Sequence, residues 1–162
     1  SQMMTQVISG SHVGQSLQLL PLEVTTWGEW KSRHPGTSVL SEKSAIRTGS
    51  VYLQRPYAAY FQSERLSFPV SRIDDQLPLK TSVLGVRVGG KACAYPVTAF
   101  SEFRLQTTLF ESLDDARYAV VYSPKSGSLR IENAAPQVSW MCAFWFAWAA
   151  FNPETAIYAA HK

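Results

Sequence analysis

A pair of glycines in the stretch VLGVRVGGKACAYPV, residues 83 to 97, constrains the fold of this chain more than any other feature. Gly89 and Gly90 can adopt the positive φ angles that a two-residue hairpin turn requires. Such a turn fixes three facing pairs on one face of the ribbon: Val88 with Lys91, Val86 with Cys93, and Leu84 with Tyr95. The sequence therefore predicts an antiparallel hairpin, with Cys93 packed as a small hydrophobic residue.

A second feature is a motif that occurs twice, Trp-x-x-Trp followed by four residues and Pro-x-Thr. It appears in WGEWKSRHPGTSVL (residues 27–40) and WFAWAAFNPETAIY (residues 145–158), at a constant offset of 145 − 27 = 118. Thr25 or Thr26 can cap the first helix, Glu29 follows Thr26 at capping-box spacing, and proline ends each helix. Each copy is predicted to form a helix that buries two indoles and returns to a strand. We expect Trp27 and Trp145 to occupy equivalent places, as after an ancient duplication.

The remaining pattern alternates short strands with short helices. Strands are expected at residues 13–24, where Pro21 implies an edge or a break, and at 37–41, 66–70, 118–123, 128–132 and 155–158. Helices are expected at residues 55–61 and 98–105 and in the aromatic segment Trp140–Phe151. The prediction is an α+β fold over residues 1–162 as a single domain. It has a mostly antiparallel sheet, short aromatic-rich helices and two similar helix–Pro–strand corners.

The composition, with 46% hydrophobic and 17% charged residues, is that of a globular domain. Lysine and arginine are scattered rather than clustered, which argues against nucleic-acid binding. The apolar segment 140–151 is shorter than the roughly 18 to 20 residues of a membrane span. The sequence has no signal-peptide pattern and leaves the compartment open. Cys93 and Cys142 are predicted to be separate packed thiols, with a disulfide as the alternative in an exported protein.

The sequence contains no nucleophile-elbow, metalloprotease or phosphate-loop motif, so it predicts no cofactor and no metal site. The pairs Asp74-Asp75 and Asp114-Asp115 are predicted to be solvated loop carboxylates. His34, which precedes Pro35, is expected to cap a helix end rather than to bind a metal. The side chains of Arg55, Tyr57 and Tyr60, with Phe61, can form a stacking surface for a small ring, with core packing as the alternative.

Several stretches together resemble the domain of unknown function 3179 family over nearly the whole chain. They are LPLEVTTWGEWKSRHPGTSVLS, RPYAAYF, FPV, DDQLPLK, VLGVRVGGKACAYPV and AFWFAWAAFNPETAIY. The resemblance is to the C-terminal portion of a longer family domain. It implies that fuller members carry a further V-x-G-V…A-Y-P pattern and a cysteine-bearing Y-C-P-x-C-G segment before the part seen here. Gln76 and Cys93 depart from the family pattern, in which arginine and lysine are frequent at those places.

Two functions compete, and a purely structural remnant of a larger protein is a third. The high aromatic content and the lack of a catalytic motif favour a non-catalytic binding or assembly domain. Its partner would be a protein, a second copy of the chain or a small ligand on an aromatic-lined surface. The alternative is a metal- or redox-associated enzyme domain whose cysteine-bearing N-terminal portion is missing here. Its catalytic candidates are Asp75, Lys80, His34 and Tyr95, which lie in the family-like motifs.

Overall fold

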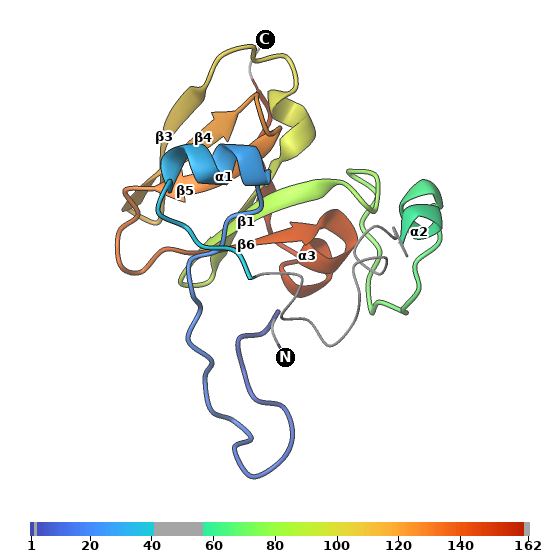
Figure 1. Cartoon of the computed structure of the whole chain (residues 1–162). Helices are drawn as coiled ribbons and strands as arrows, with labels where there is room; N and C mark the ends of the chain where they lie inside the picture. The colour runs from blue at the N-terminus through green and yellow to red at the C-terminus, as the bar shows by residue number, and fades with distance from the viewer. Residues whose placement is uncertain (2, 41–56, 161–162) are drawn as a thin grey trace. The chain divides into compact units, whose positions relative to one another are not determined.

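The structure is a computed structural model that describes residue 1 and residues 3–40 and 57–160. The chain divides into two compact units, one of Ser1–Thr25 with Val70–Lys162 and one of Thr26–Pro69. The larger unit carries both β-sheets and the helix α3 (Trp145–Phe151), whereas the described part of the smaller unit carries two short helices (Figure 1). The described elements form an α+β fold with two mostly antiparallel sheets, as predicted.

The first sheet contains the predicted hairpin. The strands β1 (Ser82–Val88) and β2 (Lys91–Pro96) are joined through Gly89, whose φ is 56°. The predicted register is confirmed: Leu84 faces Tyr95, Val86 faces Cys93 and Val88 faces Lys91. The full order is β6-β1-β2-β7, in which β6 (Ser139–Phe144) is antiparallel to β1 and β7 (Ala156–Ile157) is parallel to β2.

The second sheet has the order β3-β4-β5, with strands β3 (Thr107–Leu113), β4 (Ala116–Ser123) and β5 (Ser128–Glu132). Asp114 and Asp115 form the link between β3 and β4 and have φ angles of 50° and 63°. Aspartate is among the few residues that tolerate this left-handed backbone, which tight hairpins need. These two carboxylates are exposed in a hairpin turn, as predicted for loop carboxylates.

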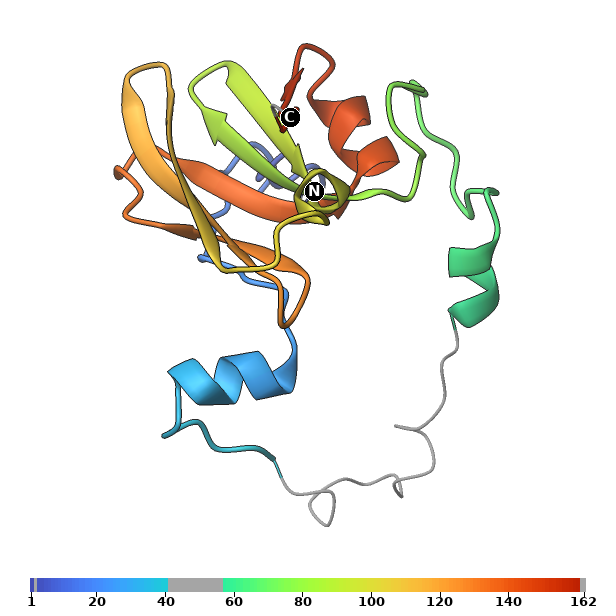
Figure 2. The same ribbon diagram turned by 90° about the horizontal axis from the view of Figure 1, so that it is seen from above.

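The main hydrophobic core lies between the two sheets (Figure 2). One side of this core is formed by alternate residues of β1, namely Leu84, Val86 and Val88. Each of these side chains is at most 4% exposed. Alternate residues of β4 and the start of β5 supply the other side, together with Phe100 from the 3-10 helix η3 (Val97–Phe100). The period-2 pattern of each strand thus places one of its faces between the sheets.

The opposite face of β1 is covered by α3 (Trp145–Phe151). Trp145 and Trp148 are both fully buried there. A Cβ atom placed on Gly85 would lie 2.3 Å from the Trp148 ring, so only glycine leaves room for the indole. The Arg87 guanidinium lies 5.9 Å from the centroid of the same ring. A helix, the first sheet and the second sheet therefore form three layers.

The smaller unit contains α1 (Trp27–Arg33) and α2 (Ala58–Gln62). The Thr26 hydroxyl accepts the backbone N–H of Glu29 at 3.3 Å, which confirms the predicted N-cap. The backbone of His34 caps the other end of α1, and its imidazole lies 4.1 Å from the Trp30 ring, centroid to centroid.

The first and second motif copies have the same local hydrogen bonds. In the first copy the Trp30 indole N–H donates to the Thr37 hydroxyl at 3.0 Å, and in the second the Trp148 indole donates to the Thr155 hydroxyl at 3.0 Å. The capping residues have nearly equal backbone angles, with φ/ψ of −129°/66° at His34 and −134°/67° at Asn152. The prediction that each copy buries two indoles is correct for the second copy and wrong for the first, because Trp145 and Trp148 are buried whereas Trp27 is 48% exposed and no residue of α1 is buried.

Several predicted elements are wrong. Residues 13–24 and 66–70 form no strand, and neither do residues 37–40, the described part of the strand expected at 37–41. Pro21 lacks an N–H donor, and positive φ angles at Gly10 and Gly14 turn the chain just before this segment. The helix expected at 98–105 is only the four-residue η3. The first half of Trp140–Phe151 belongs to β6, because pairing with β1 overrides its local helical pattern.

Candidate functional site

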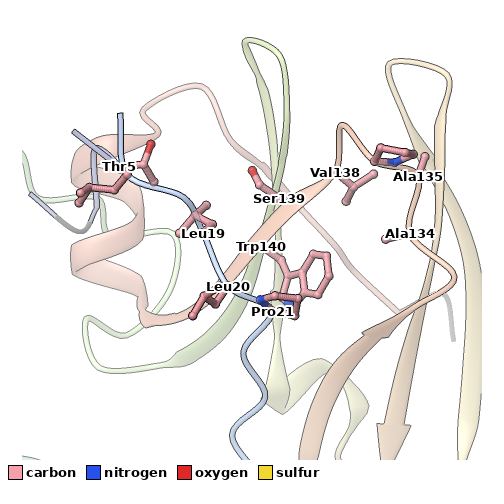
Figure 3. A pocket seen from close by; sticks show the side chains of 11 residues that line it. Thr5, Leu19, Leu20, Pro21, Ala134, Ala135, Val138, Ser139 and Trp140 are labelled. Atoms are coloured by element: carbon pink, nitrogen blue, oxygen red, sulfur yellow. The ribbon is translucent and has the colours of Figure 1, made fainter. Parts of the chain in front are cut away.

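A groove in the larger unit, lined by mostly apolar side chains and by polar backbone groups, is the clearest candidate site (Figure 3). Its volume is about 530 Å³, within the roughly 300–1,000 Å³ of small-molecule sites. Two segments far apart in sequence line it, the N-terminal stretch Leu17–Pro21 and the stretch from Ala134 into β6. The lining residues are Thr5, Leu17, Leu19, Leu20, Pro21, Ala134, Ala135, Pro136, Val138, Ser139 and Trp140.

Trp140 provides the largest side chain of the groove and is held on two sides. Its backbone lies in β6 opposite Val86, and its indole N–H donates to the Leu22 carbonyl oxygen at 3.2 Å. The neighbouring Ser139 hydroxyl donates to the Arg87 carbonyl oxygen at 3.3 Å. Because the indole N–H is already bonded, Trp140 offers the groove an apolar ring with a fixed orientation.

The N-terminal wall of the groove is tied to the sheet. The Arg87 guanidinium donates to the Met3 carbonyl oxygen at 3.1 Å, and the Leu17 backbone N–H donates to the Thr5 carbonyl oxygen at 2.8 Å. Burial lowers the pKa of Arg87, which still remains charged at neutral pH. This contact anchors the N-terminal segment to the central strand β1.

The electrostatic character of the groove is neutral. The residues that line it include no charged side chain, and their only side-chain polar groups are the hydroxyls of Thr5 and Ser139 and the indole N–H of Trp140. Apolar surface continues from Leu20 in the groove, which is 73% exposed, to Leu22 and Val24 beyond it, which are 54% and 59% exposed. A neutral, apolar ligand therefore fits this surface better than an ion.

Sequence reasoning missed this groove. The sequence predicts a strand with an edge or a break at Pro21 for LQLLPLEV and a buried helix for the segment that contains Trp140, and neither prediction indicates a groove between them. The sign that could have indicated the site is the pair of prolines, Pro21 and Pro136, each beside apolar residues. Proline interrupts strand pairing and leaves such residues without a sheet to cover them.

A buried polar cluster lies between the two sheets. The hydroxyls of Tyr95 and Tyr118 share a hydrogen bond of 2.7 Å, and both residues are at most 3% exposed. The Cys93 thiol interacts with Tyr95, and the carboxyl group of Glu111 acts electrostatically on Cys93, Tyr95 and Tyr118. Glu111 and Tyr118 also line an open hollow of about 590 Å³ with Arg117.

The pKa values of this cluster favour its uncharged forms. Burial raises the pKa of the Cys93 thiol and of the Glu111 carboxyl, and it raises the pKa of Tyr118 to about 12. The pKa of Tyr95 is raised further, first by burial and then by its bond to Tyr118. A thiol whose pKa is raised is a poor nucleophile at neutral pH.

The enzyme candidates lie in different settings. Tyr95 is buried in β2, whereas Asp75 is exposed and Lys80 half-buried in the segment before β1. His34 belongs to the other unit, where it is exposed at the end of α1. Shared catalysis by these four residues stays a prediction.

The stacking surface was predicted from Arg55, Tyr57 and Tyr60, of which Arg55 lies outside the described residues. Tyr57 precedes α2 and is 65% exposed, and Tyr60 is half-buried within the helix. Their rings lie 6.5 Å and 5.9 Å from that of Phe61, centroid to centroid. Ligand binding by this group stays a prediction.

Metal and membrane features can be stated for the described part of the chain. Within residues 3–40 and 57–160 no three histidine, cysteine or acidic side chains lie close enough to hold a metal ion. Cys93 and Cys142 are both free and partly buried, in agreement with separate thiols. In the same residues no helix has the length and apolar character to cross a bilayer.

Comparison with known proteins gives one match. Neither the curated proteins nor the solved structures contain a match to this chain. The family model of DUF3179, described as a protein of unknown function, matches residues 1–138 of the 162. This match covers most of the larger unit and all of the smaller one. The chain therefore belongs to the DUF3179 family.

Proposed function

We propose that this chain is a non-catalytic binding or assembly domain that holds a neutral, apolar group in the groove beside Trp140. The observation that carries the proposal is the lining, which combines a fixed indole with leucines and prolines and has no charged side chain. Burying such a surface against an apolar group is favourable by about 25 cal/mol per Å². The hydrogen bond from the Trp140 indole to the Leu22 carbonyl oxygen also preorganises the indole ring, which lowers the entropic cost of binding.

An apolar segment of a protein partner is the occupant that fits best. The exposed row Leu20, Leu22 and Val24 extends the groove into a strip, and a small molecule of about 530 Å³ would cover only the groove itself. Protein interfaces combine such apolar centres with a polar rim. Glu23 lies within the strip, between Leu22 and Val24, and can supply rim polarity.

The experiment combines a thermal-shift screen of neutral apolar compounds and peptides with light scattering. Leu20→Asp places a charge in the strip and is expected to weaken binding or self-association by about tenfold or more. Leu105→Asp is the matched control, because Leu105 is 79% exposed in the same unit but lies outside the groove. A wild-type chain that is strictly monomeric and is stabilised by no compound or peptide would refute the proposal.

A further inference from the structure

The groove beside Trp140 contains one edge of the first sheet. The strand order places β6 at an edge of this sheet, with β1 as its neighbour. Ser139 and Trp140 of β6 line the groove, and the N-terminal stretch Leu17–Pro21 supplies another wall (Figure 3). The backbone of β6 is therefore part of the site, and the direction of its N–H and C=O groups decides what it can bind.

The register of β1 shows which way the backbone groups of β6 point. Val88 and Lys91 flank the two-residue turn and form a hydrogen-bonded pair, so the even-numbered residues of β1 bond to β2. The odd-numbered residues of β1 then bond to the odd-numbered residues of β6, their antiparallel partners. The Trp145 N–H continues this series just beyond the strands, because it donates to the Thr81 carbonyl oxygen at 2.8 Å.

Two even-numbered residues of β6 consequently direct their backbone outward. Trp140 and Cys142 lie opposite Val86 and Leu84, so their N–H and C=O groups point away from β1. Among the described residues no partner donates to or accepts from these backbone groups. The bond from Trp140 to Leu22 uses the indole N–H and leaves the backbone of Trp140 available. An edge strand with such groups is a template for an added strand.

The other side of the same sheet shows that a very short strand is enough. The strand β7 is only Ala156–Ile157, yet it pairs in parallel with β2, and the Tyr158 N–H beside it donates to the Ala94 carbonyl oxygen at 2.9 Å. Trp140 and Cys142 offer bonds over a similar length of β6. A bound helix would not use them, because a helix satisfies its own backbone groups.

We propose that a protein partner enters the groove as an extended segment, which pairs with the outward backbone groups of Trp140 and Cys142 and turns an apolar side chain toward the Trp140 ring. This inference rests on the function proposed above and adds to it the conformation of the partner. Strand addition takes affinity from main-chain hydrogen bonds and specificity from pockets for alternate side chains. The mostly apolar side chains of the groove supply such a pocket, and the edge of β6 supplies the bonds.

The test uses the full chain and the neutral probe acetyl-Thr-Val-Thr-Leu-Thr-Val-Thr-amide, whose apolar side chains share one face of a strand. Isothermal titration measures the affinity of this probe and of a series in which each member carries one N-methylated amide. N-methylation removes a backbone donor without adding polarity, so a loss of affinity reports a main-chain bond. NMR follows hydrogen exchange of the Trp140, Met141 and Cys142 amides with and without the probe. Leu20→Asp alters the groove, and Leu105→Asp is the matched control.

The expected result is an alternation along the probe. Affinity should fall by about tenfold or more where the methylated amide faces β6, and by much less where it faces away. At saturation the probe should slow exchange of the Trp140 and Cys142 amides by about tenfold or more, whereas the Met141 amide, which points to β1, should change little. Leu20→Asp should weaken binding and Leu105→Asp should not.

Binding of the probe without alternation, or without protection of the two outward amides, would overturn the proposal and leave the groove function intact. Failure of every probe to bind would also overturn it, and the thermal-shift screen then decides separately whether the groove holds apolar groups. Slowed exchange at Trp140 and Cys142 that needs no probe and rises with chain concentration would overturn it as well, because a second copy would then be the occupant.

Discussion

Gly85→Ala tests the packing of α3 on the first sheet most directly. The new Cβ atom would lie 2.3 Å from the Trp148 ring, whereas carbon atoms pack at about 3.5–4.0 Å, so the ring must move by about 1.2–1.7 Å. Overpacking of this kind costs about 1–3 kcal/mol, and a weakened bond from the indole to Thr155 costs about 1 kcal/mol. Replacing glycine within a strand recovers about 0.5–1 kcal/mol. The expected loss in the free energy of unfolding is about 2 kcal/mol.

Equilibrium urea unfolding followed by tryptophan fluorescence measures this loss. Gly90→Ala is the matched control, because a Cβ atom there would meet nothing within 4 Å, and we expect a change within about 0.5 kcal/mol. In a Trp148→Leu background the cost of Gly85→Ala should disappear, which gives a coupling energy of about 2 kcal/mol. If Gly85→Ala leaves the stability unchanged, or costs the same in both backgrounds, then the packing of the Trp148 ring does not require glycine at position 85.

Three further results follow from buried hydrogen bonds and are measured by urea unfolding. Thr155→Val leaves the buried indole N–H without an acceptor and should cost about 1–3 kcal/mol, whereas Thr37→Val in the more exposed corner should cost less than about 0.5 kcal/mol. Tyr95→Phe and Tyr118→Phe should each cost about 1–2 kcal/mol, but the double variant should cost less than their sum, because no hydroxyl is left unpaired. The pKa of both tyrosines is raised on folding, so their contribution to stability is complete below pH 10 and falls as the pH rises above 10. The loss from Tyr118 is complete near pH 12, whereas that from Tyr95 continues beyond it. The double variant should show a smaller loss of stability over that pH range, and an unchanged pH profile would contradict the assignment.

The sequence predicted those parts of the fold that depend on neighbouring residues. The β1–β2 register follows from the turn at Gly89, and the Thr26 cap follows from its spacing to Glu29. The strand character of residues 139–144 could not be predicted in the same way, because it results from pairing with β1, more than 50 residues away in the chain. Local helical preference is weak enough for such pairing to override it.

The candidate site was unpredictable for a similar reason. The groove forms where Leu17–Pro21 meets Trp140, and nothing in either segment alone indicates the other. Tyr95 was placed correctly on the inner face of the hairpin, but its partner Tyr118 lies on the other sheet. Sequence spacing predicts which face of its strand Tyr95 occupies. Its contact with Tyr118 across the core depends on how the two sheets pack, which spacing within one strand does not indicate.

The two corners separate what a motif encodes from what its surroundings decide. The bond from indole to threonine is 3.0 Å both in the buried corner and in the exposed one, so burial does not create it. Burial instead requires a strand with glycine at the right place, and β1 supplies Gly85 to Trp148. Lys31 of the first corner is equivalent to Ala149 of the second. A lysine there is compatible with the local hydrogen bonds of the corner but not with full burial, so this difference agrees with the separate origins of the bonds and of burial. A Trp-x-x-Trp…Pro-x-Thr motif thus predicts the shape of a corner, and a glycine-bearing hairpin must be found before its indoles are assigned to a core.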